Sequence, residues 1–166
     1  MKSSVTIREA ELSDLEALFD LQRALGDAEL PFWRFIDRAG LETADKWGFP
    51  GYVDIEAKIK CDDNCVVVAE AEGTGPIGVS YGQIKTDDCW SLLDQFGYVG
   101  CVFVRKEFRG EGHSVWPKML AALEAWFKER GITQLRLECL DANKVALKAY
   151  EKSNFRPMLQ VMSKEI

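Results

Sequence analysis

Hydrophobic and polar residues follow two different periods near the N-terminus of the chain. Residues 5–9 alternate between apolar and polar side chains, which predicts a first strand. In residues 15–25 apolar side chains recur at helical spacing, and Ser13 with Glu16 three positions later matches a capping box. We therefore expect an amphipathic helix that ends near Gly26.

The segment from Asp27 to Cys61 has no clear period. Pro31 suits the first turn of a helix, where its missing N–H would be unpaired in any case. Gly48, Pro50 and Gly51 then interrupt any regular element. We expect a short helix followed by an ordered loop.

The middle of the chain predicts a hairpin and a third strand. Two runs rich in β-branched residues, 65–71 and 77–85, flank the turn sequence EGTGP. After a polar loop, residues 98–104 (YVGCVFV) have the composition of another strand.

The C-terminal part alternates between helices and strands. Residues 116–130 have a helical apolar face, with Pro117 in the first turn and Gly131 where a C-terminal cap belongs. The elements expected after it are a strand over 133–140, a helix over 141–155 capped by Asp141 or Asn143, and a terminal strand over 155–166.

The predicted element order, β-α-α-β-β-β-α-β-α-β, indicates a mixed α/β fold in which helices flank a central sheet. The chain has 166 residues, a length that suits one hydrophobic core and so a single domain spanning 1–166.

Composition and charge exclude several classes of protein. No apolar run approaches the roughly 18 residues of a membrane-spanning helix, and the N-terminus is acidic where a signal peptide would be apolar. The net charge of −6, from 21 basic and 27 acidic residues, lacks the basic surface of a nucleic-acid-binding protein. We expect a cytoplasmic protein without membrane or nucleic-acid partners.

The cysteines and the histidine do not form a metal-binding pattern. Five scattered cysteines, an odd number, are typical of free thiols in a reducing compartment. Only Cys61 and Cys65 are close together, and His113 is the one histidine, whereas a zinc site needs about four convergent ligands. We expect no metal.

A glycine-containing loop follows the strand at 98–104. It lacks the Gly-Lys-Ser or Gly-Lys-Thr of a Walker motif and the third glycine of a dinucleotide fingerprint, and the chain has no Ser-His-acid triad signature. Backbone N–H groups at a helix N-terminus attract phosphate without basic side chains, and Gly110 and Gly112 would allow a close approach. The spacing alone leaves open both an anion-binding loop and a purely structural turn.

Two motifs carry a resemblance to a known family. The stretch Arg109-Gly110-Glu111-Gly112-His113-Ser114 resembles the pyrophosphate loop, Arg/Gln-x-x-Gly-x-Gly/Ala, of the GNAT superfamily of acyl-CoA-dependent N-acetyltransferases. The helix from Asn143 to Phe155 is similar to the family pattern Asn-x-x-Ala-x-x-x-Tyr-x-x-x-Gly-Phe. Asn154 replaces the glycine, and asparagine tolerates positive φ. The residues SVWP, 114–117, suggest a loop about two residues longer than the family's.

The resemblance implies a GNAT-like fold with a mostly antiparallel sheet and acetyl-CoA as co-substrate. Backbone groups of Val102, Phe103 and Val104 would bind the pantetheine arm and polarise the thioester carbonyl, and residues 109–114 would hold the pyrophosphate. Asn143 would hydrogen-bond the cofactor near the thioester, with or without capping its helix.

By the same resemblance, Tyr150 is the general acid for the departing thiolate, and the alternative is that it packs in the core. The base is less defined because residues 98–104 contain no carboxylate. Glu138 is the first candidate, although half of the side chains of a strand point away from any one face, and a water relayed to Asp94 or Glu70 is the alternative. His113 lies in the cofactor loop and is not expected to be catalytic.

The acceptor is expected to contact the segment 27–63 and the loop near residue 88. Residues 27–63 include nine acidic and five basic residues, which favours a cationic amine, although such charges also serve only to solvate a helix and a loop. Aromatic residues there could surround an ammonium group or belong to the core. The candidate acceptor contacts are Phe32, Trp33, Asp87, Asp88 and Trp90.

The function expected from these observations is transfer of an acetyl group from acetyl-CoA to a primary amine of a small molecule. A protein or peptide N-acetyltransferase is the alternative within the same chemistry. A non-catalytic acyl-CoA-binding protein is the alternative outside it, since the strand at 98–104 lacks a carboxylate. A homodimer through the last strand or the aromatic segment stays open.

Overall fold

The structure is a computed structural model that describes residues 4–32, 53–86, 94–110, 114–160 and 162. Its described strands form one sheet in the order β1 (Val5–Glu9), β2 (Asn64–Ala71), β3 (Gly75–Thr86), β4 (Gln95–Val104) and β5 (Leu135–Arg136). The first four are antiparallel neighbours, and β5 pairs with β4 in parallel. The predicted mixed α/β fold with a mostly antiparallel sheet is confirmed.

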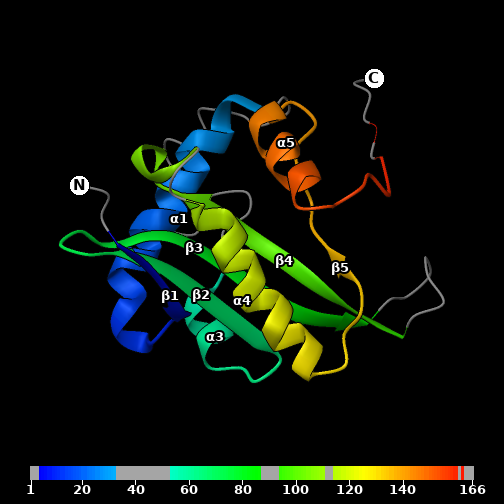
Figure 1. Cartoon of the computed structure of the whole chain (residues 1–166), viewed down its shortest axis with the longest axis horizontal. Coiled ribbons are helices and arrows are strands. Elements are labelled where there is room, and N and C mark those ends of the chain that lie inside the picture. Colours follow the sequence, from blue (N-terminus) through cyan, green and yellow to red (C-terminus); the bar gives the residue numbers. More distant parts are fainter. Residues whose placement is uncertain (1–3, 33–52, 87–93, 111–113, 161, 163–166) are drawn as a thin grey trace.

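The helices cover both faces of the sheet (Figure 1). They are α1 (Leu15–Glu29), α3 (Ile55–Ile59), α4 (Val115–Glu129) and α5 (Lys144–Lys152). Apolar side chains of α4 pack on one face, while those of α1 and α3 pack on the other, so that two hydrophobic clusters enclose the sheet. None of the described helices is long and apolar enough to cross a membrane.

Phe127 of α4 sets how closely this helix approaches the sheet. Its side chain is 1% exposed and lies over two glycines. A Cβ at Gly82 would stand 2.7 Å from Phe127 Cζ, and one at Gly97 would stand 2.7 Å from Phe127 Cε1. Because Gly82 on β3 and Gly97 on β4 have no side chains, the Phe127 ring fits against the sheet at these two positions.

The hairpin and the C-terminal helices agree with the sequence analysis. β2 and β3 form the predicted hairpin. Gly131 has φ +75°, and the Ile132 N–H donates to the Phe127 carbonyl at 3.0 Å, as expected of a glycine cap. Asn143 caps α5, and Asn154 has the predicted positive φ, +66°.

The start and the end of the first helix differ from the prediction. Ser13 is not its N-cap, because residues 12–14 form a 3-10 turn in which the Glu11 N–H donates to the Asp14 carboxylate at 2.8 Å. The helix also continues past Gly26 to Glu29, since Gly26 is buried and lacks the positive φ of a cap.

Three further expectations are wrong for the described residues. The segment predicted as a loop before the hairpin contains α3, whose cap Asp54 accepts the Ala57 N–H at 2.9 Å. The strand predicted over 133–140 is reduced to Leu135–Arg136. No strand forms in residues 155–160 and 162, where Pro157 has no N–H for a ladder. A 3-10 turn spans Leu30–Phe32 near the helix expected at Pro31, and residues 33–52 lie outside the description.

Candidate active site

The last two strands pair only at one end. The parallel pairs are Gly97 with Leu135 and Tyr98 with Arg136, whereas β4 continues to Val104. Figure 1 shows the chain after β5 turning away from β4 toward α5. In the part of the chain that the structure describes, no strand pairs with the backbone groups that the far half of β4 directs away from β3.

A β-bulge interrupts β4 where β5 has already ended. The register with β3 shifts between Val79 and Tyr81, and Cys101 has φ +51°, which is uncommon for a residue with a side chain. The buried hydroxyl of Ser80 donates to the Gly100 carbonyl at 3.0 Å and so supports the bulge. Bulges redirect the groups that follow them, and they are common beside active sites.

The three predicted backbone contacts on β4 do not all point the same way. The Arg105 N–H donates to the Ile77 carbonyl of β3 at 2.8 Å, so the alternate residue Phe103 also directs its N–H and carbonyl toward β3. Val102 and Val104 direct theirs to the opposite side. The Val104 carbonyl accepts a hydrogen bond from Arg109 Nε at 2.6 Å, which ties the strand to the loop that follows it.

Gly110 and Ser114 flank the predicted anion-binding loop in left-handed conformations. Gly110 has φ +89° with no atom within 4 Å of where a Cβ would be, so its requirement is conformational and not steric. Ser114 has φ +50° and precedes α4 directly. Glu111, Gly112 and His113 lie outside the described residues.

The expectation of a loop extended by SVWP is wrong. Val115, Trp116 and Pro117 form the first turn of α4. The first N–H groups of a helix have no partner inside it, and proline lacks one altogether. The donors of this turn are therefore the N–H groups of Val115 and Trp116.

Tyr150 lies where α5 meets the first turn of α4. Its ring packs edge-on against Trp116, with 5.5 Å between centroids, and also against Phe155. Trp116 Nε1 donates to Ser153 Oγ at 2.9 Å and joins the two helices. Burial, with smaller effects of neighbouring charges, raises the pKa of Tyr150, so its hydroxyl keeps its proton at neutral pH.

Asn143 does cap α5, as the alternative interpretation of this residue predicted. Its side-chain oxygen accepts the Ala146 N–H at 3.2 Å. This bond uses the carbonyl end of the amide, and a cofactor contact would have to use the NH₂ end, which has two donors.

Two carboxylates approach this region from different elements. Glu138, the predicted base, is exposed beyond the end of β5 and accepts a hydrogen bond from Tyr98 Oη at 3.3 Å. Glu29 ends α1, and burial raises its pKa. Burial is the main cause of the raised pKa values of Cys101, Cys139 and Tyr150, and the charge of Glu29 adds to each.

Sequence analysis missed Glu29, because one more acidic residue on a helix with a polar face has no distinguishing pattern. Neither carboxylate named there as an alternative joins this group by any described contact. Glu70 is held by Arg8, whose Nε donates to it at 2.9 Å between β1 and β2, at the edge of the sheet away from β5, and Asp94 is exposed.

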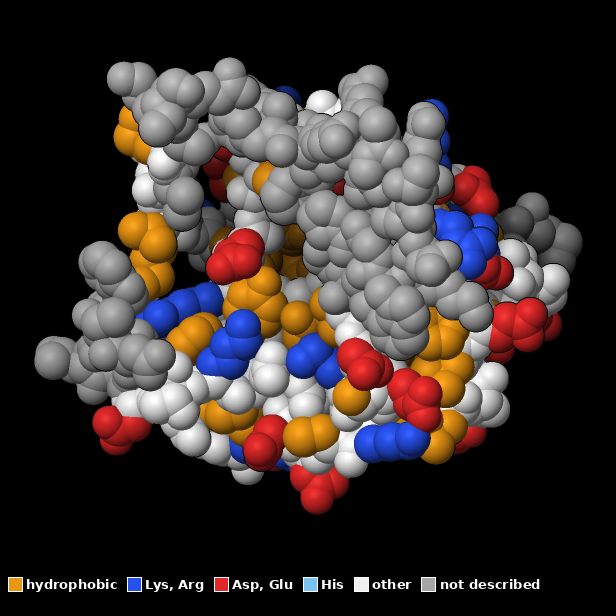
Figure 2. Space-filling model, turned by 180° about the vertical axis from the view of Figure 1, so that it is seen from behind, with side chains coloured by type: hydrophobic (Ala, Val, Ile, Leu, Met, Phe, Trp, Pro, Cys, Tyr) orange, Lys and Arg blue, Asp and Glu red, His pale blue; other side chains and the backbone are white. Residues whose placement is uncertain are grey.

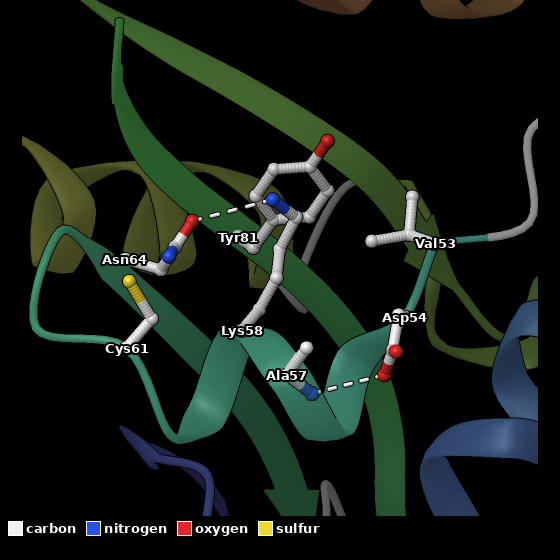
Figure 3. A pocket seen from close by; sticks show the side chains of 7 residues that line it. All are labelled: Val53, Asp54, Ala57, Lys58, Cys61, Asn64 and Tyr81. Carbon is white, nitrogen blue, oxygen red and sulfur yellow. Dashed lines mark hydrogen bonds between the residues drawn. The ribbon is translucent and has the colours of Figure 1, made fainter.

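The acceptor contacts predicted from the sequence fall mostly outside the described residues. Phe32 is half-buried at the end of its 3-10 turn, and Trp33, Asp87, Asp88 and Trp90 are not described. The described part has instead an open depression of about 470 Å³ between α3 and β3, which sequence analysis did not predict. It is lined by Val53, Asp54, Ala57, Lys58, Cys61, Asn64 and Tyr81 (Figure 3).

The family model described as Acetyltransferase (GNAT) family matches residues 26–155. No curated protein matches the sequence. Among solved structures, a tetramutant of the BH1408 protein from Bacillus halodurans superposes with a TM-score of 0.78 at 18% identity, covering 97% of this chain and 99% of that one.

Two further solved structures have names that state an activity. The aminoglycoside N-acetyltransferase AAC(6')-Iy, bound to a bisubstrate analogue made from CoA and acetylneamine, has a TM-score of 0.69 at 20% identity, covering 99% of both chains. Glucosamine-6-phosphate N-acetyltransferase from Arabidopsis thaliana has a TM-score of 0.65 at 22% identity, covering 98% of both. At these identities the likeness concerns the fold.

Proposed function

Because this chain belongs to the GNAT acetyltransferase family, we propose that it transfers an acetyl group from acetyl-CoA to a primary amine of a small-molecule acceptor. The reaction is a direct attack within a ternary complex. The amine nitrogen bonds to the thioester carbonyl carbon and the carbon–sulfur bond breaks. The nitrogen loses a proton to a base and the sulfur gains one from an acid, so that an amide and the CoA thiol form.

The observation that supports this proposal most is the unpaired half of β4 after the bulge at Cys101. The N–H groups of Val102 and Val104 point away from β3, where an extended pantetheine arm can pair with them as a strand would. A donor of this kind placed at the thioester carbonyl stabilises the developing oxyanion by a few kcal/mol. The backbone groups of Phe103 face β3 and its side chain is buried in the core, so it is assigned no contact with the pantetheine arm.

The pyrophosphate binds at the start of α4. Gly110 and Ser114 turn the backbone there, and the N–H groups of Val115 and Trp116 stand at the positive end of the helix dipole. A chain of net charge −6 can bind a polyanionic cofactor in this way, since backbone donors supply the attraction.

Tyr150 protonates the departing thiolate. Its raised pKa means that the hydroxyl carries a proton throughout the neutral range, as an acid must. Asn143, at the other end of the same helix, binds the cofactor through the amide NH₂ that its capping role does not use.

Glu138 and Glu29 are the two candidates for the base. Glu138 is exposed and would act through a water or on the ammonium directly. The raised pKa of Glu29 brings it closer to neutrality, where a general base is most effective. Glu29→Gln and Glu138→Gln separate them, because only removal of the base lowers kcat with an unchanged KM for acetyl-CoA.

Two measurements test the proposal. Calorimetry of acetyl-CoA binding tests the cofactor site, and thiol release from acetyl-CoA in the presence of amines, aminoglycosides, polyamines, amino acids and peptides tests the transfer. Failure to bind acetyl-CoA overturns the proposal. Binding without thiol release for any amine favours a non-catalytic acyl-CoA-binding protein, which the absence of a carboxylate from β4 also favours. Release with peptides alone favours a peptide N-acetyltransferase.

A further inference from the structure

Two lysine ammonium groups lie over two neighbouring tyrosine rings on the α3 side of the sheet. Lys58 Nζ stands 4.4 Å from the ring centroid of Tyr81, and Lys85 Nζ stands 3.7 Å from that of Tyr98. The two ring centroids are 6.2 Å apart. The four side chains come from α3, β3 and β4 and form one surface, which we call the lysine–tyrosine surface.

Neither lysine of this surface forms an ion pair with a carboxylate among the described residues, and Asp54 acts on Lys58 only as a nearby charge. Lys58 Nζ donates to the neutral amide oxygens of Asn64 and Gln83, at 3.2 Å and 3.1 Å. Burial, and then the charge of Lys85, lowers the pKa of Lys58. A half-buried ammonium group held by neutral amide oxygens and a ring, with a second lysine nearby, is stabilised further when an anion binds there.

Among the described residues, Lys58 and Tyr81 of this surface line an open depression. Figure 3 shows Lys58 reaching over the Tyr81 ring at the floor of the depression between α3 and β3, with Asn64 beside it. Asp54 at the rim uses a carboxylate oxygen to accept the Ala57 N–H. From behind, Figure 2 shows Lys and Arg side chains gathered along one side of a hollow with a hydrophobic floor.

The lysine–tyrosine surface connects directly to the proposed reaction centre. Tyr81 Cζ and Oη stand 2.5 Å from where a Cβ on Gly100 would be, so the ring tip touches β4 next to the bulge at Cys101. Tyr98 Oη donates to Glu138, the predicted base, at 3.3 Å, so this surface also borders the carboxylate beyond β5. A ligand spanning the two regions would meet cationic groups at one end and carboxylates at the other.

We propose that the acceptor is a primary amine that also carries an anionic group, a carboxylate or a phosphate, bound by Lys58 and Lys85. This inference rests on the proposed function, since it assigns the amine end of the same molecule to the acetyl-CoA end of the site. The anion neutralises the two lysines, and the ammonium end is drawn toward Glu138 and Glu29. It also refines the expectation of a cationic acceptor: the amine is cationic, and the molecule as a whole is not.

The first experiment measures anion binding without catalysis. Inorganic phosphate is titrated calorimetrically into protein saturated with CoA, which already fills the pyrophosphate site. We expect binding that Lys58→Met and Lys85→Met each weaken at least about tenfold, the loss of one charge-assisted hydrogen bond. Lys60→Met is the matched control, because Lys60 lies on the same helix but is exposed and paired with Glu56. The affinity of Lys60→Met for phosphate should equal that of the wild-type protein.

The second experiment measures kcat/KM for matched acceptor pairs. Amino sugars are compared with their phosphates, and amino acids with their amides, so that only the anionic group differs within a pair. We expect the anionic member to be preferred about tenfold or more, and the preference to disappear in Lys58→Met and Lys85→Met but not in Lys60→Met. Which pair shows the larger preference distinguishes phosphate from carboxylate.

The outcomes separate this inference from the proposed function. Equal turnover of both members of every pair, or phosphate binding that ignores both lysines, overturns the inference and leaves acetyl transfer intact. Lysine-dependent phosphate binding without transfer to any amine confirms an anion site at the two lysines, but it contradicts the proposed function and overturns the assignment of that site to an acceptor. A loss of kcat in Lys58→Met that is the same for charged and neutral acceptors assigns Lys58 to proton transfer and overturns the inference.

Discussion

Replacing Gly110 by alanine tests whether the loop before α4 holds the cofactor. Gly110 has φ +89°, and no atom lies within 4 Å of the site of a new Cβ. The cost of alanine is therefore the conformational penalty alone, about 1–2 kcal/mol, offset by about 0.4–1 kcal/mol from the reduced freedom of the unfolded chain. The net strain is about 1 kcal/mol, which the free loop can relieve by changing its backbone angles.

Acetyl-CoA must then restore the native loop before its pyrophosphate can bind. We expect Gly110→Ala to weaken acetyl-CoA binding about fivefold, the equivalent of about 1 kcal/mol, in isothermal titration calorimetry. Gly73→Ala is the control, since Gly73 has φ +75° with equally open surroundings but lies in the turn between β2 and β3. Gly73→Ala should lose at most about 1 kcal/mol of stability in urea titrations and should bind acetyl-CoA with wild-type affinity. Wild-type affinity in Gly110→Ala, or an equal loss in Gly73→Ala, would refute the reasoning.

Three further outcomes are expected. Phe127→Ala should destabilise the protein by about 3–5 kcal/mol in urea titrations, since it empties the space over the two strand glycines, and a loss below about 1 kcal/mol would contradict this packing. Tyr150→Phe should lower kcat by about 10²–10⁴ without changing the affinity for acetyl-CoA, and full kcat at every pH would exclude Tyr150 as the acid. The hydrogen bond and charge of Arg8 lower the pKa of Asp14, so their pairing stabilises the fold above the unfolded-state pKa and is lost as pH falls through the folded one. Asp14→Asn should therefore flatten the loss of stability below about pH 4 in urea midpoints, and an unchanged acid profile would argue against the pair.

Most of the elements followed from local pattern, and the errors have identifiable physical causes. The hairpin, α4 and α5 were predictable because their apolar period, turn residues and caps all agree. Residues 133–140 look like a full strand but pair over only two residues. Pairing depends on where β4 lies in space, which composition does not encode.

In the candidate site too, features that depend on local sequence were predictable and features that depend on strand pairing were not. Residues 109–114 and Tyr150 were predicted as site residues because their spacing follows motifs that are local in the chain, and that assignment stays a prediction. The bulge at Cys101 was not, since its positive φ occurs at a residue that ordinarily avoids it and is held there by strand pairing.

The sequence by itself determined the order of most elements, the two motifs and the membership of an acetyltransferase family, because each depends on residues close together in the chain. The tertiary structure decided which of these residues meet. It ended the pairing of β4 with β5 after Tyr98, and it brought Glu29 into the electrostatic range of Tyr150. It also laid Lys58 and Lys85 over adjacent tyrosine rings. These residues are far apart in the sequence, and they lie close together because the helices pack on a twisted sheet.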